Sequence, residues 1–183
     1  MSIRIHFGLP GRKISARLTL VAVLSTLILV GCSRNNSSEG GSSPRVNSAC
    51  IKPDANARNN ILTAIFEANA GDTVLLCEGK FDMPTGLLIN SKPGLTLKGA
   101  GMKKTFLNFA NSDSAEGINA SYSDGLILQD FTVEDTPGNG IRIFRSEKIV
   151  VRGVSARWHD AAGRDETDPD YTPRSDVGAY ALY

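Results

Sequence analysis

The 183-residue sequence lacks a long hydrophobic segment, a cluster of cysteine and histidine, and an excess of positive charge. Its most apolar stretch, residues 18–30, is shorter than the roughly 20 residues that a membrane-spanning helix needs. Three cysteines and two histidines are present, and one histidine lies beyond Gly31. A metal centre built from thiolates and imidazoles is therefore not expected. No Gly-Lys-Ser or Gly-Lys-Thr follows Gly99-Ala-Gly101, so this glycine pair is no phosphate-binding loop.

The segment 1–31 has the pattern of a secretory signal. A basic leader precedes the short apolar stretch, which ends in small residues, and this order is typical of exported proteins. The segment Leu29-Val30-Gly31-Cys32 resembles the lipobox of bacterial lipoproteins. The resemblance implies a diacylglycerol on Cys32, cleavage before it, and a lipid anchor in the membrane. Because Ser33 rather than Asp follows, it also implies sorting to the outer membrane. The alternative is an ordinary cleaved signal with an incidental cysteine.

Removal of the leader changes the charge of the protein. The whole chain has a net charge of +1, but the segment 1–31 holds four basic side chains and no acidic ones. The remainder carries 16 basic and 19 acidic side chains, a net charge of −3. It shows no basic stretch of the kind that binds nucleic acid, and nucleic acid is not an expected partner. A mildly acidic exported protein fits glycans, small solutes or metal ions better.

The remaining two cysteines, Cys50 and Cys77, form an even pair in an exported chain. A disulfide is the expected state in an oxidising compartment, and two buried free thiols are the alternative. Residues 32–49 are rich in Ser, Asn and Gly and show no apolar periodicity, which is typical of a flexible tether. We therefore expect one folded domain over residues 50–183.

Short elements follow this tether. Apolar residues at helical spacing predict one amphipathic helix over residues 57–69, ended by Asn69-Ala70-Gly71. Beyond it, short apolar segments separated by turn-forming residues predict strands. These strands are Thr73–Cys77, Leu87–Ile89, Leu95–Lys98, Thr105–Phe109, Leu126–Gln129, Phe131–Val133, Gly140–Phe144, Ile149–Arg152 and Val154–Ala156.

Two parts of this ladder repeat at one spacing. Residues 125–133 align with residues 148–156, and Gly117-Ile118 aligns with Gly140-Ile141 at the same offset. A fixed period in this range, filled with short strands, indicates a solenoid. We predict an all-β parallel β-helix with coils of about 23 residues, in which Leu128 stacks under Val151. The helix would cap the open edge of the first coil. An α+β domain with an unrelated helix is the alternative.

The sequence also resembles the right-handed parallel β-helix proteins of the pectin-lyase-like superfamily. The resemblance rests on Gly71-Asp-Thr-Val-Leu-Leu76, Gly79-Lys-Phe81 and Leu95-Thr-Leu-Lys-Gly-Ala-Gly101. In particular, it is similar to exported bacterial lipoproteins with parallel β-helix repeats, and it covers about residues 50–183. The superfamily includes lyases, hydrolases, epimerases and non-enzymatic binders, so the resemblance leaves the activity open. Only four to five coils fit into the chain, and we expect it to be the N-terminal part of a longer solenoid.

The period is broken once, late in the chain. Gly140-Ile141 aligns with Gly178-Ala179 at a spacing clearly longer than the repeat, and the additional residues fall between Trp158 and Asp176. Loops on a rigid scaffold often carry function. This loop is rich in acidic side chains and contains the histidine of the mature chain. The candidate catalytic residues are Arg157, His159 and Asp160, and the candidate ligands of a Ca²⁺ ion are Asp165, Asp168 and Asp170.

Three interpretations of this loop are open. In the first, carboxylates hold Ca²⁺ through hard oxygen ligands, the ion neutralises a uronate, and an Arg or the His removes a proton, as in lyases and epimerases. In the second, two carboxylates hydrolyse a glycoside. In the third, the loop is a solvated insertion with weak surface ion pairs. We expect a lipid-anchored protein of the bacterial envelope that binds or processes carbohydrate, for example an acidic polysaccharide. The alternative is a non-catalytic envelope scaffold or interaction protein.

Overall fold

The computed structural model describes residues 45, 49–174 and 180–183. The predicted leader, the predicted lipidation site Cys32 and nearly all of the predicted tether lie outside these residues. The chain divides into two units, Met1–Gly40 and Gly41–Tyr183, and every described residue belongs to the second. Within the described residues, no helix has the length and the apolar character that crossing a membrane requires.

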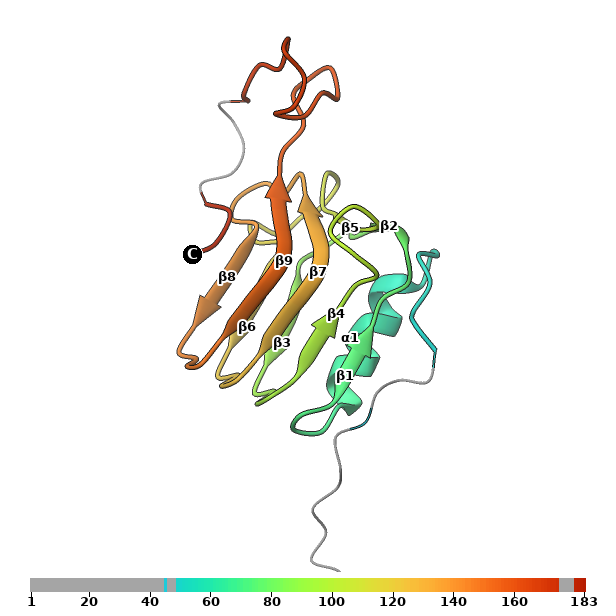
Figure 1. The fold of residues 1–183 in the computed structure, drawn as a ribbon, viewed down its shortest axis with the longest axis vertical. Coiled ribbons are helices and arrows are strands. Elements are labelled where there is room, and N and C mark those ends of the chain that lie inside the picture. The colour runs from blue at the N-terminus through green and yellow to red at the C-terminus, as the bar shows by residue number, and fades with distance from the viewer. Residues whose placement is uncertain (1–44, 46–48, 175–179) are drawn as a thin grey trace, which may run out of the picture. The chain divides into compact units, whose positions relative to one another are not determined.

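The described part is a parallel β-solenoid of about three turns with one short helix (Figure 1). Every pairing between its strands is parallel. The elements are α1 (Ala57–Glu67), β1 (Thr73–Leu75), β2 (Gly79–Asp82), β3 (Leu87–Asn90), β4 (Thr96–Lys98), β5 (Thr105–Asn108), β6 (Ile118–Ser121), β7 (Ile127–Glu134), β8 (Ile141–Phe144) and β9 (Val150–Arg157). The predicted fold class is confirmed, whereas four to five coils were too many for these residues.

The strands form three faces. The first consists of β1, β4 and the beginnings of β7 and β9, and the second of β2, β5 and the ends of β7 and β9. The third consists of β3, β6 and β8. The predicted period is confirmed, because Ile118 pairs with Ile141 and Leu128 with Val151. Between Leu87 and Ile118 the coil is longer, because the chain makes additional turns before and after β5.

Side chains alternate between the interior and the surface along each strand, as the pleat of a strand requires. On the second face, Phe81, Leu107 and Val133 stack in the core with at most 1% exposure. Their neighbours along the strands point outwards and form the outer surface of that face. The core row therefore fixes which polar side chains meet outside.

Helix α1 covers the end of the solenoid at its first coil, as the sequence predicted. It packs against β1, β2 and β3, with Ala57, Ile61 and Ile65 buried. Burial of a large aliphatic side chain contributes about 1.5–3 kcal/mol, so Ile61 and Ile65 contribute most to holding this helix of 11 residues on the first coil. The helix shields part of a strand edge that would otherwise be open.

Strands β7 and β9 each turn a corner within one continuous strand. The sequence predicted two shorter strands at each place, separated at Asp130 and Gly153, and the structure bends there with φ angles of 62° and 58°. Gly153 lies over Asp130, and a Cβ atom at Gly153 would be 2.6 Å from the Asp130 Oδ1. A glycine is therefore needed at this corner both for its conformation and for space. The bend aims the ends of β7 and β9 at the second face.

Two other predictions have clear outcomes. The Cys50–Cys77 disulfide is present, with its Cα atoms 5.0 Å apart, and it ties the segment before α1 to the residues after β1. The alignment of Ile141 with Ala179 was wrong, because Ile141 forms a parallel bridge with Leu182. The loop between them is thus longer than the repeat suggested. Ala179 itself lies outside the described residues.

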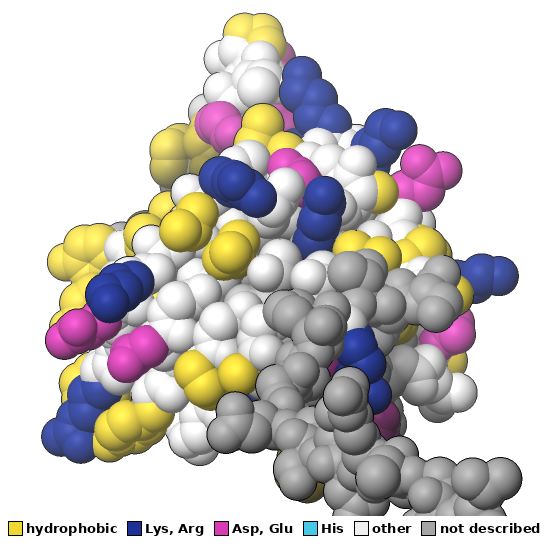
Figure 2. All heavy atoms as spheres, turned by 60° about the horizontal axis from the view of Figure 1, so that its bottom comes forward, with side chains coloured by type: hydrophobic (Ala, Val, Ile, Leu, Met, Phe, Trp, Pro, Cys, Tyr) yellow, Lys and Arg dark blue, Asp and Glu magenta, His cyan; other side chains and the backbone are white. Residues whose placement is uncertain are grey.

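The face shown in Figure 2 carries a mixed surface. Its Lys and Arg side chains are interspersed with Asp, Glu and small groups of hydrophobic side chains. Among the described residues of this view, no continuous basic patch is seen. This distribution agrees with the near balance of charges in the sequence.

Candidate functional site

Polar side chains form a row across the outer surface of the second face. Asp82 of β2 pairs in register with Asn108 of β5, Asn108 with Glu134 of β7, and Glu134 with Arg157 of β9. Each residue is the last of its strand and follows the core row described above or its equivalent in the next coil. The solenoid therefore brings together four side chains from four strands that are well separated in the sequence.

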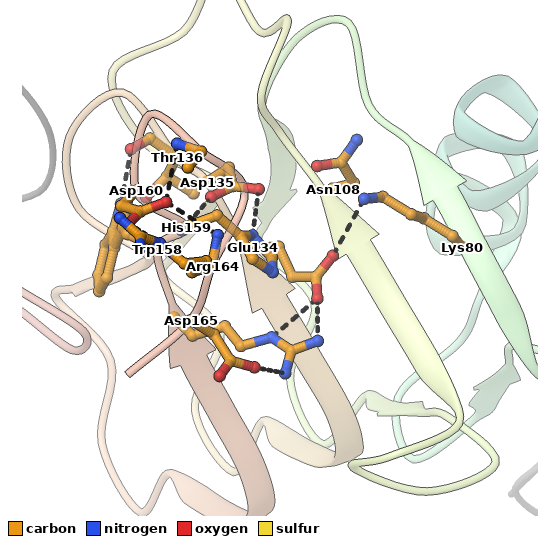
Figure 3. Close-up of polar contacts among 12 residues, drawn as sticks. Lys80, Asn108, Glu134, Asp135, Thr136, Trp158, His159, Asp160, Arg164 and Asp165 are labelled. Carbon is orange, nitrogen blue, oxygen red and sulfur yellow. Dashed lines mark hydrogen bonds and ion pairs between the residues drawn. The ribbon is translucent and has the colours of Figure 1, made fainter. Parts of the chain in front are cut away.

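Glu134 is the centre of this row. The residue is 2% exposed, and a buried carboxylate needs compensating partners. Arg157 supplies two hydrogen bonds to Oε1, one from Nε at 2.8 Å. The Lys80 Nζ lies 3.4 Å from Oε2. Figure 3 shows Lys80 and Glu134 pointing toward one another, with Asn108 beside them.

His159 is held in place by Asp135, the residue that follows β7. The Asp135 carboxylate accepts the His159 backbone N–H at 2.7 Å and contacts the imidazole Nδ1 at 2.8 Å. If Nδ1 carries the proton of the neutral ring, Nε2 is an acceptor. Asp135 itself has a φ of 55°, a conformation that Asp adopts more readily than most residues. This pairing can thus orient a proton-accepting nitrogen.

A cavity of about 350 Å³ joins these groups. Its lining includes Lys80, Phe106, Glu134, Arg157 and His159. The Arg157 guanidinium lies 5.2 Å from the centre of the Phe106 ring, a cation–π contact that fixes one wall of the cavity. Two of the three predicted catalytic residues, Arg157 and His159, therefore meet at one cavity together with a second cation.

Asp160, the third predicted catalytic residue, does not line this cavity. Its carboxylate accepts the backbone N–H groups of Ala162 and Arg164 at 2.8 and 2.9 Å and the Arg164 Nε at 2.8 Å. The Arg164 backbone N–H is the main cause that lowers the pKa of Asp160 to about 2. The side chain is 2% exposed. These contacts give Asp160 a role in organising the loop.

Two of the three predicted calcium ligands, Asp165 and Asp168, have their carboxylates bound to groups of the protein. Asp165 contacts the Arg157 Nη1 at 3.1 Å, and a hydrogen bond from the Thr167 hydroxyl is the largest cause that lowers the pKa of Asp165. Asp168 accepts the Asp170 backbone N–H at 2.8 Å. Across the part of the chain that the structure describes, no group of three or more His, Cys, Asp or Glu side chains is arranged to hold a metal ion. The calcium site therefore stays a prediction.

Trp158 fixes the start of the loop to the solenoid. Its indole Nε1 donates a hydrogen bond of 2.7 Å to the carbonyl oxygen of Thr136. Figure 1 shows the following loop extending beyond the end of β9. With Asp135 holding His159 next in the chain, two successive residues anchor the loop beside the cavity.

Sequence reasoning missed Lys80, Phe106, Asn108, Glu134 and Asp135 as parts of a site. Strand β2 was not predicted, because its four residues contain one apolar side chain, Phe81. A signal for Glu134 was present in the repeat that aligns it with Arg157. The role of Asp135 depends on its contact with His159 in the long loop. The path of this loop could not be predicted, because the loop is not part of the sequence repeat.

No protein-family model and no curated protein matches the chain. Among solved structures, the chain is similar to "Structure of PL6 family alginate lyase AlyGC", with 17% sequence identity and a TM-score of 0.46. The match covers 63% of this chain, and this chain spans 16% of the length of that lyase. We therefore base the functional proposal on the cavity itself.

Proposed function

We propose that the 350 Å³ cavity binds a negatively charged sugar unit of an acidic polysaccharide and that His159 removes a proton from it. One observation carries the proposal: Lys80 and Arg157 line the same cavity as a histidine whose other ring nitrogen contacts Asp135 at 2.8 Å. The cations match a uronate carboxylate, and the ring of Phe106 offers an apolar wall. This combination fits anion binding and proton transfer in one place.

Lys80 is the cation best placed to meet the sugar carboxylate. Its side chain is 52% exposed, and its ammonium lies 3.4 Å from Glu134, a spacing that allows it to turn toward a ligand. Arg157 is held more firmly, by Glu134 on one side and Asp165 on the other. The two carboxylates offset its charge, so Arg157 acts mainly through its fixed position in the cavity wall, while Lys80 makes the adjustable contact.

The chemistry follows from the acidity of a carbon–hydrogen bond next to a carboxylate. His159 Nε2 takes the C5 proton of the uronate, and the electron pair is delocalised into the carboxylate, where the two cations stabilise it. In a lyase the pair then forms the C4–C5 double bond, the C4–O bond breaks, and the leaving oxygen takes a proton from water. In an epimerase a water molecule on the opposite face gives a proton to C5, and His159 releases the proton that it took to the resulting hydroxide.

The decisive experiment is an assay of the mature protein against a panel of polyuronates with and without Ca²⁺. The proposal expects one polymer to yield unsaturated sugars, seen by their ultraviolet absorbance, or inverted C5 centres, seen by NMR. Binding without either product would leave a carbohydrate-binding protein. Neither binding nor product with any polymer would overturn the proposal. An increase of activity or melting temperature with Ca²⁺ would support the ligands Asp165, Asp168 and Asp170.

A non-catalytic envelope scaffold is the second candidate, and one observation favours it. Arg157 already bonds two carboxylates, those of Glu134 and Asp165, as expected of a structural ion-pair network. For either function we place the protein at the bacterial outer membrane through a lipid on Cys32. This location is supported by the lipobox-like sequence Leu29-Val30-Gly31-Cys32.

A further inference from the structure

A second cavity, of about 590 Å³, lies between α1 and β3. Leu62 and Phe66 of the helix and Leu88 of the strand form its apolar walls. Its lining also contains Arg58 and Lys92, and no Asp or Glu side chain of the described chain belongs to it. The volume is in the range of small-ligand sites. This cavity shares no lining residue with the 350 Å³ cavity, so it can have a ligand of its own.

The apolar walls of this cavity are more exposed than the stability of the fold requires. Phe66 is 81% exposed, the highest value for a large hydrophobic side chain among the described residues, and Leu88 is 55% exposed. The helix is already held on the first coil by Ile61 and Ile65, which are buried on its other side. Exposed apolar side chains that lie together without serving the core are typical of a binding surface.

Arg58 is the cation of this cavity with free donors. Within the described residues, its guanidinium makes one long hydrogen bond, from Nη1 to the Asn59 Oδ1 at 3.4 Å, and no ion pair. Lys92, in contrast, donates to the carbonyl oxygens of Phe66 and Ala68 at 2.6 and 3.1 Å. It therefore satisfies the last turn of α1. Arg58 is left to bind an anion, and a guanidinium can do so with two parallel hydrogen bonds.

The free cation and the apolar walls follow one another along the helix. Arg58 lies in the first turn of α1 and Phe66 in the last, and eight residues of helix rise by about 12 Å. At the far end, the Lys92 ammonium lies 5.7 Å from the centre of the Phe66 ring. The cavity thus offers a positive charge at one end and an apolar path that leads away from it. A ligand of matching shape carries an anion at one end of an apolar chain.

We propose that the 590 Å³ cavity binds a single-chain anionic lipid, such as a fatty acid. The carboxylate pairs with Arg58. The chain lies over Leu62 and Leu88 toward Phe66, where burial of its methylene groups stabilises the complex. This binding site goes beyond the proposed function and does not depend on it.

A membrane surface is the competing occupant, because anionic phospholipids offer the same chemistry. Attraction to such a surface needs a cluster of several cations, whereas this cavity has Arg58 as its one cation with free donors. Glu67, the residue after Phe66, is exposed and would face the negative surface beside the cavity. These observations favour a single lipid molecule, and the membrane is an outcome of the test.

The test uses residues 32–183 with Cys32→Ala, so that neither a lipid anchor nor a detergent competes for the cavity. NMR titration measures the binding of decanoate and of decanol, which have equal chains, at concentrations below those at which they aggregate. Decanoate should bind at least several-fold more tightly, and both ligands should shift the signals of Phe66 and Leu88. Vesicles of phosphatidylglycerol are the third probe and should not retain the protein.

Three variants separate the charge from the apolar walls. Arg58→Gln should weaken the binding of decanoate about 10-fold, as expected for a hydrogen bond to a charged group, and should leave decanol unchanged. Leu88→Ala, an exposed change on β3, should weaken both ligands several-fold and guards against an effect of Arg58→Gln on folding. Arg152→Gln is the matched control, because Arg152 is an exposed arginine on the first face, and should change neither affinity.

Equal affinity for decanoate and decanol would overturn the inference, as would binding of decanoate that Arg58→Gln leaves unchanged. Absence of binding, or signal shifts confined to residues outside this cavity, would also overturn it. Retention on the vesicles without binding of free decanoate would show a membrane-contacting surface instead. The assay with polyuronates tests the 350 Å³ cavity separately, so the two proposals can fail independently.

Discussion

Glu134 and Arg157 occupy the same position in successive coils, and the guanidinium donates two hydrogen bonds to a single carboxylate oxygen, Oε1. Their Cα atoms pair because β7 and β9 are in register over a spacing of 23 residues. The register of the two strands therefore places this charged pair at the candidate site.

Glu134→Gln should destabilise the protein by about 1–3 kcal/mol. The substitution removes the partner of a buried ion pair, but Arg157 retains Asp165, which limits the loss. Urea denaturation measures the change. Glu116→Gln is the control, because Glu116 lies 3.7 Å from Arg142 and both are more exposed, so its effect should stay below about 1 kcal/mol. Equal effects of the two substitutions would contradict this account of Glu134.

His159→Gln should lower the turnover of any uronate substrate by about 10²–10⁴-fold, the usual contribution of a general base. Asp135→Asn should lower kcat with little change in KM, because it acts only by holding His159. Steady-state kinetics on the active polymer measures both. Glu147→Gln, an exposed change on the far turn before β9, should have no effect. Full activity of His159→Gln would exclude this residue as the base.

Acidification should loosen the 158–174 loop before the solenoid unfolds. The pKa of Asp160 is lowered to about 2 in the folded state from its ordinary value of 3.8. Its stabilising contribution is therefore complete above about pH 4 and is lost as the pH falls toward 2. Fluorescence of Trp158, the single tryptophan, reports on the loop. Asp160→Asn should perturb this signal at neutral pH and flatten its change between pH 4 and 2; a wild-type-like acid transition would contradict the assignment.

Loss of the Cys50–Cys77 disulfide should cost about 3–4 kcal/mol, because the bond closes a loop of 27 residues. The double variant Cys50→Ser/Cys77→Ser, compared with the wild-type protein in urea, measures the loss. Thiol titration of the unfolded, unreduced mature protein checks the premise and should find neither of the two cysteines free. A double variant as stable as the wild type would show that α1 and the first coil do not depend on this bond.

Cys32→Ala should prevent incorporation of a fatty-acid label and should release the protein from the membrane fraction. This expectation rests on the proposal that the thiol of Cys32, in the lipobox-like sequence, is the acceptor of a lipid. Metabolic labelling and fractionation of the full chain in a bacterial host measure both effects. Cys50→Ala is the matched control and should retain the label. A label that survives Cys32→Ala would place the lipid elsewhere or exclude it.

The solenoid could be predicted from the sequence because its core residues repeat. Leu128 and Val151 occupy equivalent positions in successive coils. Apolar residues that recur at a fixed spacing of this length are typical of a solenoid and of few other folds. The disulfide was also predictable, since only two cysteines remain after Cys32. Only part of the site could be predicted: His159 stood out by residue type within an irregular loop, and Arg157 stood out because it lies directly before that loop. Lys80 could not be singled out from the sequence. Its role depends on Glu134, which lies far from it in the sequence and comes close only in the folded solenoid.

The position of the long loop shows the limit of such reasoning. The repeat aligned Ile141 with Ala179, but the bridge forms with Leu182, since a loop can add residues without disturbing the coils on either side. Asp160 was judged by its charge alone. Its carboxylate is instead enclosed by backbone N–H groups of its own loop, a local arrangement that composition does not encode.

The capped first coil has a consequence for how the chain assembles. Each strand of the second and third coils finds its partner 23 to 31 residues earlier in the sequence, and the disulfide and α1 give the first coil a firm edge of its own. That edge can act as a template on which each following coil forms its strand pairs in turn. Assembly would then proceed in one direction, from the amino-terminal end, without waiting for distant parts of the chain.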